Sequence, residues 1–431
     1  MTDTVDLPVA QRTKRIIAAG TVGNIIEWYD FAIYGLFATV LAKNFFPSGD
    51  KVASLLATLA VFAVSFFIRP FGAIVFGAYG DRHGRKKALA ATVILMGLGT
   101  LMVGVLPTYD SIGVLAPILL VVARLVQGLS TGGEWSGSSV FVVEHAPVRR
   151  RGLYGSWVQF GASGGSLLGS LLGVLLGLVF STAQVESWAW RLPFLLGGVL
   201  GAFGLLLRTR LEDTPEFNDL RERGEVVESG LGRAVTSRWR DGARAFGFTL
   251  AYTVSVYMLL TYMPTYVTTT TDIKLTNALL SNSIQLAVML TLIPFAGALS
   301  DRVGRRPVLL AFCALAAVLT YPLFLLISVG TIAAVIIGQV VFACVVALIG
   351  GAGPTATAEM FPTNVRFSAL GISYNLAVAA FGGTAPFIST LLISVTGDHT
   401  TPALYMIAAA VVTGLVVLRL PETARRPLRK N

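Results

Sequence analysis

Acidic side chains occur within long apolar stretches of this sequence, where an ionised group is energetically costly. Glu27 and Asp30 are three residues apart in the first such stretch, so a helix would place both on one face. Carboxyl groups buried in a membrane usually face a cavity and mark ion or proton pathways. We therefore expect Glu27, Asp30 and, in the fourth stretch, Glu134 to be the proton-coupling candidates. The alternative is that these acids form structural ion pairs with arginines near one membrane surface.

Two arginines, Arg69 and Arg124, also fall within apolar stretches. A buried guanidinium needs a carboxylate, which either the protein or a bound solute can supply. Gln127 is one helical turn from Arg124, and Glu134 is two turns further, so these side chains could line one stripe of a cavity. We predict that Arg69, Arg124 and Gln127 bind the solute and that the acids neutralise the arginines when the site is empty. A permanent internal ion pair is the competing interpretation, above all for Arg69.

The second half of the chain offers polar rather than ionisable side chains at comparable depth. Most buried tyrosines are core residues with one satisfied hydrogen bond, so only Tyr262 and Asn375 are predicted to contact the solute. An aromatic surface in this half could also receive a quaternary ammonium group through a cation–π contact. The polar side chains deep enough to meet a solute are Tyr257, Tyr262, Gln285, Gln339, Tyr374 and Asn375.

The elements that must position these residues are transmembrane helices. Of the 431 residues, 54% are hydrophobic and 13% are charged, about half of the charged fraction usual in soluble domains. A span needs roughly 20 apolar residues, which predicts an all-α integral membrane protein with twelve transmembrane helices. They are expected near 16–42, 52–79, 88–107, 112–141, 153–181, 188–208, 245–269, 276–299, 307–329, 331–358, 366–396 and 402–420.

A sequence motif divides these twelve spans into two six-helix halves. Gly-x3-Asp-Arg-x-Gly-Arg begins at Gly77 and again at Gly297, each time between two apolar runs. We predict two six-helix bundles, 1–208 and 245–431, joined by a cytoplasmic linker at 209–244. Most of the 33 Lys and Arg residues fall in alternate connections and at the termini, which places both termini in the cytoplasm. The net charge of +10 therefore reflects orientation and not nucleic-acid binding.

The motifs resemble those of the major facilitator superfamily, and within it the metabolite:proton symporter family. The resemblance covers nearly the whole chain and is greatest to the proline/betaine transporters of bacteria, with 2-oxoglutarate and shikimate permeases also similar. The stretches that carry it include GNIIEWYDF (23–31), IRPFG (68–72), QGLSTGGEW (127–135), WRLPF (190–194), YMLLTYMP (257–264), AEMFP (358–362) and ETARRPL (422–428).

In that superfamily, contacts at the two motif loops hold the cytoplasmic side shut and break as the halves rock. The resemblance thus implies a cytoplasmic gate, with Asp81 and Arg85 favoured over the second copy. The simpler interpretation is that the positive charge of the motif loops only sets the orientation of the chain in the membrane. The candidate gate residues are Gly77, Asp81, Arg82, Arg85, Gly297, Asp301, Arg302 and Arg305.

The resemblance implies proton-coupled symport of a small zwitterionic or carboxylate metabolite across the bacterial cytoplasmic membrane, by alternating access. An organic acid such as 2-oxoglutarate or shikimate is the alternative solute, because Arg124 is typical of the organic-acid members. Metabolite efflux and a non-transporting sensor also remain open.

Several classes of function find no support in the sequence. There is no Walker loop for ATP, and the histidines at 83, 145 and 399 fall outside the spans, so we expect no enzyme. Cys313 and Cys344 lie in apolar runs and suggest neither a disulfide nor a metal site. No cofactor is expected. The partners are a small-molecule substrate, a proton and the lipid bilayer. The oligomeric state stays open, with a monomer expected.

Overall fold

The computed structural model describes residues 9–83, 85–132, 134–209, 239–362 and 366–428. Over these ranges the chain is α-helical, and no strand occurs in them. The first half contains α1 (Val9–Leu36), α2 (Ala38–Phe45), α3 (Lys51–Phe67), α4 (Arg69–His83), α5 (Arg85–Val105), α6 (Tyr109–Ile112), α7 (Leu115–Ser130), α8 (Glu134–His145), η1 (Val148–Arg150), α9 (Arg151–Val179), α10 (Thr182–Gln184), η2 (Val185–Ala189) and α11 (Arg191–Thr209).

The second half begins earlier than the predicted residue 245, and most of the predicted linker at 209–244 lies outside the described residues. Its elements are α14 (Trp239–Tyr257), η3 (Met258–Tyr262), α15 (Met263–Thr270), α16 (Leu275–Val303), α17 (Arg305–Ser328), α18 (Ile332–Glu359), α19 (Arg366–Ala377), η4 (Val378–Gly382), α20 (Ala385–Thr396) and α21 (Thr401–Leu418).

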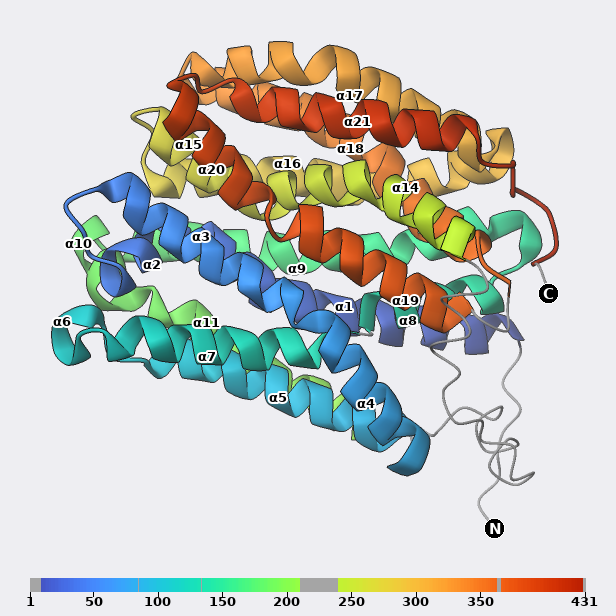
Figure 1. Ribbon diagram of the computed structural model, residues 1–431, viewed down its shortest axis with the longest axis horizontal. Coiled ribbons are helices and arrows are strands. Elements are labelled where there is room, and N and C mark those ends of the chain that lie inside the picture. The colour runs from blue at the N-terminus through green and yellow to red at the C-terminus, as the bar shows by residue number, and fades with distance from the viewer. Residues whose placement is uncertain (1–8, 84, 133, 210–238, 363–365, 429–431) are drawn as a thin grey trace.

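These helices group into the twelve predicted spans. Nine helical stretches in the described ranges are long and apolar enough to cross a bilayer, and two bent helix pairs bring the number to eleven. The shorter apolar helix Ala90–Val105, within α5, lies at the predicted third span. The all-helical, twelve-span architecture is thereby confirmed. In Figure 1 the first half, in blue to green, lies below the second half, in yellow to red, and α4 and α21 both end at the right-hand side.

We call this side the motif end, because both copies of the repeated motif lie there, at the connections from α4 to α5 and from α16 to α17. The other side, where α2 meets α3 and α15 meets α16, is the opposite end.

Several spans are interrupted, and proline explains three of the interruptions. Pro70 follows the break between α3 and α4 at Ile68, and the wider π-helical turns η3 and η4 precede Pro264 and Pro386. A proline has no N–H and cannot continue the hydrogen-bond ladder of a helix. The fourth span is broken after Ser130, so the continuous stripe predicted from Arg124 to Glu134 is divided between α7 and α8.

Helix α9 is the seam between the two halves. It carries a glycine every fourth residue, and a Cβ at Gly165 would come within 2.3 Å of the carbonyl oxygen of Ile25 in α1. Further along, a Cβ at Gly177 would lie 2.0 Å from Thr276 Oγ1 in α16. Small residues at this spacing let helix backbones approach closely. α9 therefore packs on α1 of the first half and on α16 of the second half over the same part of its length, as at Gly173, which lies close to both Phe37 and Leu279.

Candidate functional site

The two acids of α1 are both buried, at 1% exposure each. Asp30 points toward α11, where a Cβ added at Gly197 would lie 2.7 Å from its Oδ1 and 2.7 Å from the methyl carbon of Thr100. Neither carboxylate oxygen of Asp30 accepts a hydrogen bond from another described residue. The neighbouring hydroxyl of Thr100 donates instead to the carbonyl of Met96, at 3.0 Å. Asp30 is thus enclosed within the first half, between α1, α5 and α11.

Arg124 of α7 belongs to a chain of hydrogen bonds that joins three helices, α3, α7 and α5, through neutral partners. Its Nη1 donates to Gln127 Oε1 at 2.8 Å, and its Nη2 donates to Ser65 Oγ of α3 at 3.0 Å. Gln127 in turn donates from Nε2 to Thr100 Oγ1 at 2.7 Å. Arg124, Gln127 and Ser65 are each buried. The hydrogen-bond chain therefore runs from Ser65 through Arg124 and Gln127 to Thr100, beside Asp30.

Aromatic rings surround both buried arginines. The Cζ of Arg124 lies 4.3 Å from the ring centroid of Tyr34 and 5.2 Å from that of Phe31. The Cζ of Arg69, in α4, lies 4.3 Å from Phe31 and 4.3 Å from Phe66. A cation over a desolvated aromatic face gains about 2 kcal/mol or more. The two guanidinium groups therefore share the ring of Phe31, and we call these five residues the arginine–aromatic cluster.

The second half reaches this cluster through Tyr257 of α14. Its ring centroid lies 5.2 Å from Phe66 and 5.2 Å from Trp28 of α1. Closer to the motif end, Trp135 of α8 stacks on Tyr374 of α19, with centroids 3.8 Å apart and planes at 7°. The centre of the molecule is thus an aromatic interface between the halves, with the charged groups on the side of the first half.

The structure brings together Asp30, Arg69, Arg124 and Gln127, and it buries Glu27 on the same helix as Asp30. The two residues predicted in the second half lie elsewhere. The hydroxyl of Tyr262 is 2.8 Å from Thr390 Oγ1, inside the second half. Asn375 donates to the carbonyls of Gly371 and Gly132, and so bridges α19 to the turn after α7. The side chain of Glu134 lies outside the described residues.

The aromatic residues of the arginine–aromatic cluster were not predicted from the sequence, although their spacing gives a signal. Phe62, Phe66 and Arg69 follow one another at four and three residues, and Tyr34 is four residues from Asp30. Such spacings place side chains on one helical face. In a chain with 25 phenylalanines and 12 tyrosines, this signal is weak.

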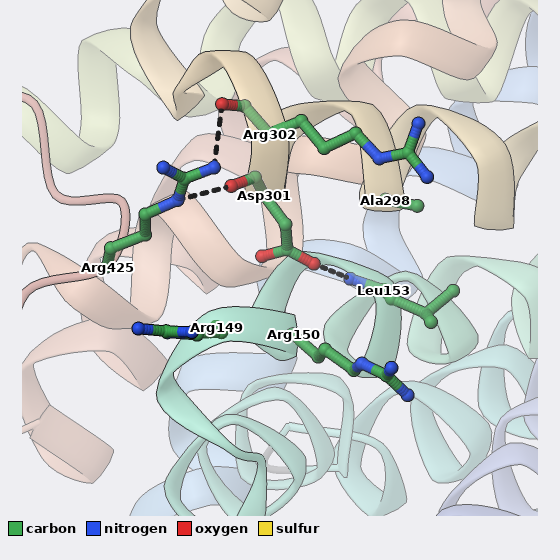
Figure 2. A pocket seen from close by; sticks show the side chains of 7 residues that line it. All are labelled: Arg149, Arg150, Leu153, Ala298, Asp301, Arg302 and Arg425. Carbon is green, nitrogen blue, oxygen red and sulfur yellow. Dashed lines mark hydrogen bonds between the residues drawn. The ribbon is translucent and has the colours of Figure 1, made fainter.

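At the motif end, the second copy of the motif connects the halves. Asp301 accepts hydrogen bonds from the backbone nitrogens of Gly152 at 2.8 Å and Leu153 at 2.9 Å, in the first turn of α9. Arg305 donates to Asp301 at 2.8 Å and to Glu359 at 3.3 Å. A Cβ at Gly297 would lie 2.5 Å from the carbonyl oxygen of Gly152, so this close approach requires glycine. Figure 2 shows Asp301 directed at Leu153.

The first copy cannot be compared in the same way, because the side chains of Gly77, Asp81, Arg82 and Arg85 lie outside the described residues. One ion pair nearby does join the halves. Arg366 Nη1 of α19 lies 2.6 Å from Glu144 Oε1 of α8.

The opposite end is also closed by contacts between the halves. Thr265 donates to the carbonyl of Gly35 at 3.3 Å, and Ser170 donates to the carbonyl of Leu279 at 2.9 Å. In this conformation Glu27, Asp30, Arg69 and Arg124 are each at most 3% exposed. The expectation that they line a water-filled cavity is therefore not met in this closed form, because the halves meet at both ends.

In the part of the chain that the structure describes, helical spans in two halves with charged residues enclosed at the centre have the arrangement of the major facilitator fold. The chain belongs to the sugar (and other) transporter family, whose model matches residues 16–243 and 243–431. The family and the curated relatives are membrane transport proteins and not enzymes.

Among curated relatives, the "Proline/betaine transporter" of Escherichia coli K12 is 38% identical over 427 residues, which cover 97% of this chain and 85% of the relative. The "Glycine betaine/proline/ectoine/pipecolic acid transporter OusA" of Dickeya dadantii is 37% identical over 427 residues, with the same coverage. The "Ectoine/proline transporter ProP" of Corynebacterium glutamicum is 37% identical over 441 residues, covering 99% and 87%.

Solved structures share the fold at lower identity. The proton:xylose symporter XylE bound to 6-bromo-6-deoxy-D-glucose has a TM-score of 0.77 and 18% identity, over 98% of both chains. XylE from E. coli in a partially occluded inward-open conformation has a TM-score of 0.74 and 18% identity, over 95% of this chain and 98% of that one.

Proposed function

We propose that this protein imports a small zwitterionic metabolite of the proline or betaine kind together with a proton, by alternating access. The observation that carries the proposal is the arginine–aromatic cluster next to Asp30. A guanidinium offers two parallel donors to a carboxylate, and aromatic faces attract a quaternary or secondary ammonium. One site can thus receive both ends of a zwitterion. Names of relatives that are 37–38% identical over nearly the whole chain support the same solute class.

Charge balance at the centre supports coupling to a proton. With both acids ionised, Glu27 and Asp30 balance Arg69 and Arg124. Protonation of one acid leaves one arginine without an ionised partner acid, so that this arginine can bind the carboxylate of the solute, while the ammonium group of a zwitterion would lie against the aromatic faces. Asp30 is enclosed beside the hydrogen-bond chain of Arg124, Gln127 and Thr100, and an enclosed acid in a membrane protein commonly marks a proton pathway. We therefore infer that Asp30 carries the proton, with Glu27 and Glu134 as the other candidates.

An organic acid is the second candidate solute, because Arg69 and Arg124 both contact Phe31 and could hold two carboxylates. A dianion would leave the centre neutral only if both acids were protonated, so two protons would have to accompany each solute.

For orientation we propose that the motif end faces the cytoplasm of a bacterium, with both termini there. Connections rich in Lys and Arg are expected on that side. Asp301, Arg302 and Arg305, with Gly297, would then form the cytoplasmic gate, and Gly77, Asp81, Arg82 and Arg85 would form its counterpart. Asn375 and Tyr262 remain proposed solute contacts in other conformations.

Transport assays in proteoliposomes test this proposal. Uptake of labelled proline, glycine betaine and 2-oxoglutarate is measured with and without an inward proton gradient. We expect accumulation of proline or betaine that depends on the gradient. Accumulation of 2-oxoglutarate alone would show that the solute is an organic acid. Accumulation of none of the three would contradict the proposed solute class.

A further inference from the structure

A pocket of about 740 Å³ opens at the motif end, on the seam between the two halves (Figure 2). The first half contributes the turn η1 and the start of α9, and the second half contributes the end of α16 and the segment after α21. The pocket is lined by Arg149, Arg150, Leu153, Ala298, Asp301, Arg302 and Arg425.

The pocket is strongly basic. Four of its lining residues are arginines, and Asp301 is the one acid among them. The carboxylate of Asp301 already accepts hydrogen bonds from the start of α9 and from Arg305. Arg425 donates to the backbone carbonyls of Asp301 and Arg302, which leaves its charge uncompensated. Within the described ranges, Arg149, Arg150 and Arg302 form no ion pair with a carboxylate. The pocket is thus suited to an anion.

An apolar groove of about 380 Å³ adjoins this pocket and shares Ala298 and Arg302 with it. The groove lies between α16 and α18, within two membrane spans. Its rim faces outward, because Phe295 is 68% and Leu299 is 42% exposed. The other lining residues are Leu292, Ala296, Cys344, Ala347 and Leu348. A ligand held by the arginines could therefore extend an apolar chain along α16 into the bilayer.

We propose that the pocket and the groove together bind one anionic phospholipid. The phosphate would lie among the four arginines and an acyl chain would lie between α16 and α18. Basic pockets between transmembrane helices suit lipid headgroups, and each Lys or Arg near the surface adds about 1 kcal/mol of attraction to anionic lipid, which is a factor of about five in binding. A soluble phosphate would occupy the basic pocket alone and would leave the adjoining groove unexplained.

The headgroup would touch both halves of the molecule. Arg149 and Arg150 belong to the first half, and Arg302 and Arg425 belong to the second. A bound phosphate would bring these like charges together across the seam, next to the contact of Asp301 with α9. The lipid would thereby favour the conformation in which the motif end is closed.

Lipid retention tests the basic pocket. The full chain is released from micelles that contain equal amounts of phosphatidylglycerol and phosphatidylcholine, and bound lipid is counted by native mass spectrometry. We expect phosphatidylglycerol to be retained preferentially. In the double variant Arg149→Gln/Arg302→Gln this retention should fall at least about tenfold. The control Arg419→Gln removes an exposed charge at the same end, outside the pocket, and should retain lipid like the parent. Equal retention of the two lipids by the parent would overturn the proposal.

Fluorescence quenching tests the groove. In Phe295→Trp, an aromatic ring is kept at the rim of the groove, and the added emission is compared with that of the parent chain. Phosphatidylglycerol with brominated acyl chains should quench it more than brominated phosphatidylcholine, and the double arginine variant should remove the difference. If the two lipids quench equally, and inorganic phosphate but not phosphatidylglycerol binds to the parent and is lost from the double arginine variant, the pocket binds free phosphate only and the lipid proposal fails.

Discussion

The carboxylate of Asp301, near the end of α16, lies 2.8 Å from the backbone nitrogen of Gly152, in the first turn of α9. The first N–H groups of a helix have no partner within the helix, and they carry the positive end of its dipole. An acid from one half of the chain therefore caps a helix of the other half. Such a contact can hold the motif end closed without a covalent link, and it can break when the halves move apart.

Replacing Asp301 by Asn should loosen this end. Charge-assisted hydrogen bonds contribute about 1.5–3 kcal/mol, so the open fraction should rise about tenfold or more. A cysteine at position 156 (Ser156→Cys) measures this opening, because Ser156 is buried next to Gly297 and becomes accessible only when the motif end opens. In a chain lacking Cys313 and Cys344, its alkylation by a water-soluble maleimide should be faster with Asp301→Asn. Glu186→Gln, which breaks an exposed ion pair with Lys43 at the opposite end, is the control. An unchanged alkylation rate would show that Asp301 does not hold this end closed.

The sequence predicted the spans well, because each needs a long apolar run and the repeated motif relates one half to the other. It also brought Asp30, Arg124 and Gln127 into one site, because their types are costly in a membrane. The sequence did not predict which side chains of the second half contact the first half, because that depends on how the helices pack. Tyr257 meets Phe66 across the interface between the halves, while Tyr262, five residues later, turns to Thr390 within the second half. The π-helical turn between them changes the direction of side chains, and a regular 3.6-residue period cannot anticipate that.

Asp30→Asn should separate exchange from accumulation. The amide keeps the size of the side chain but cannot release a proton, so a proton gradient would no longer drive uptake. We expect gradient-driven accumulation in proteoliposomes to be abolished, while counterflow exchange of labelled solute stays measurable. Unimpaired accumulation by Asp30→Asn would remove this residue from the proton path and would direct attention to Glu27.

Arg124→Lys keeps the charge and should still impair solute binding. An ammonium group is a compact donor and cannot reproduce the planar fork that reaches Gln127 and Ser65 at once. Each lost hydrogen bond to a charged group costs about 1.5–3 kcal/mol, so the concentration for half-maximal counterflow should rise about tenfold or more. Arg191→Lys, at the start of α11, is the matched control. Equal affinities in the two variants would exclude Arg124 from the solute site.

Gly72→Ala should destabilise the part of the fold that holds Arg69 beside Arg124. A Cβ at Gly72 would lie 1.8 Å from the carbonyl oxygen of Leu129, so α4 and α7 would have to separate. A methyl group forced into a packed contact costs about 1–3 kcal/mol. Gly97→Ala is the control, because its Cβ would have its nearest neighbour at 3.6 Å. We expect a lower Tm in detergent for Gly72→Ala and an unchanged Tm for Gly97→Ala. The same Tm for both variants would show that the close contact between α4 and α7 does not require glycine at position 72.

Glu422 should make stability depend on pH. Although partial burial alone would raise the pKa of Glu422, hydrogen bonds from the backbone nitrogens of Ala424, Arg305 and Arg306 hold it below its usual value. Two of these donors belong to the first turn of α17, so the carboxylate caps that helix. A pKa lowered by folding means that the ionised form stabilises the folded state. This stabilisation is fully present above the unfolded pKa of about 4.3 and is lost as the pH falls through the folded value.

Glu422→Gln should therefore lower the Tm at pH 7, since losing a helix cap typically costs about 1 kcal/mol. The difference from the parent should shrink as the pH falls below about 4.3, because the parent carboxyl becomes neutral as well. Glu186→Gln, in an exposed ion pair, should change the Tm much less at any pH. The measurement is the Tm of each purified variant in detergent between pH 3 and pH 8. A difference that stays constant over this range would show that packing, and not the charge of Glu422, stabilises the start of α17.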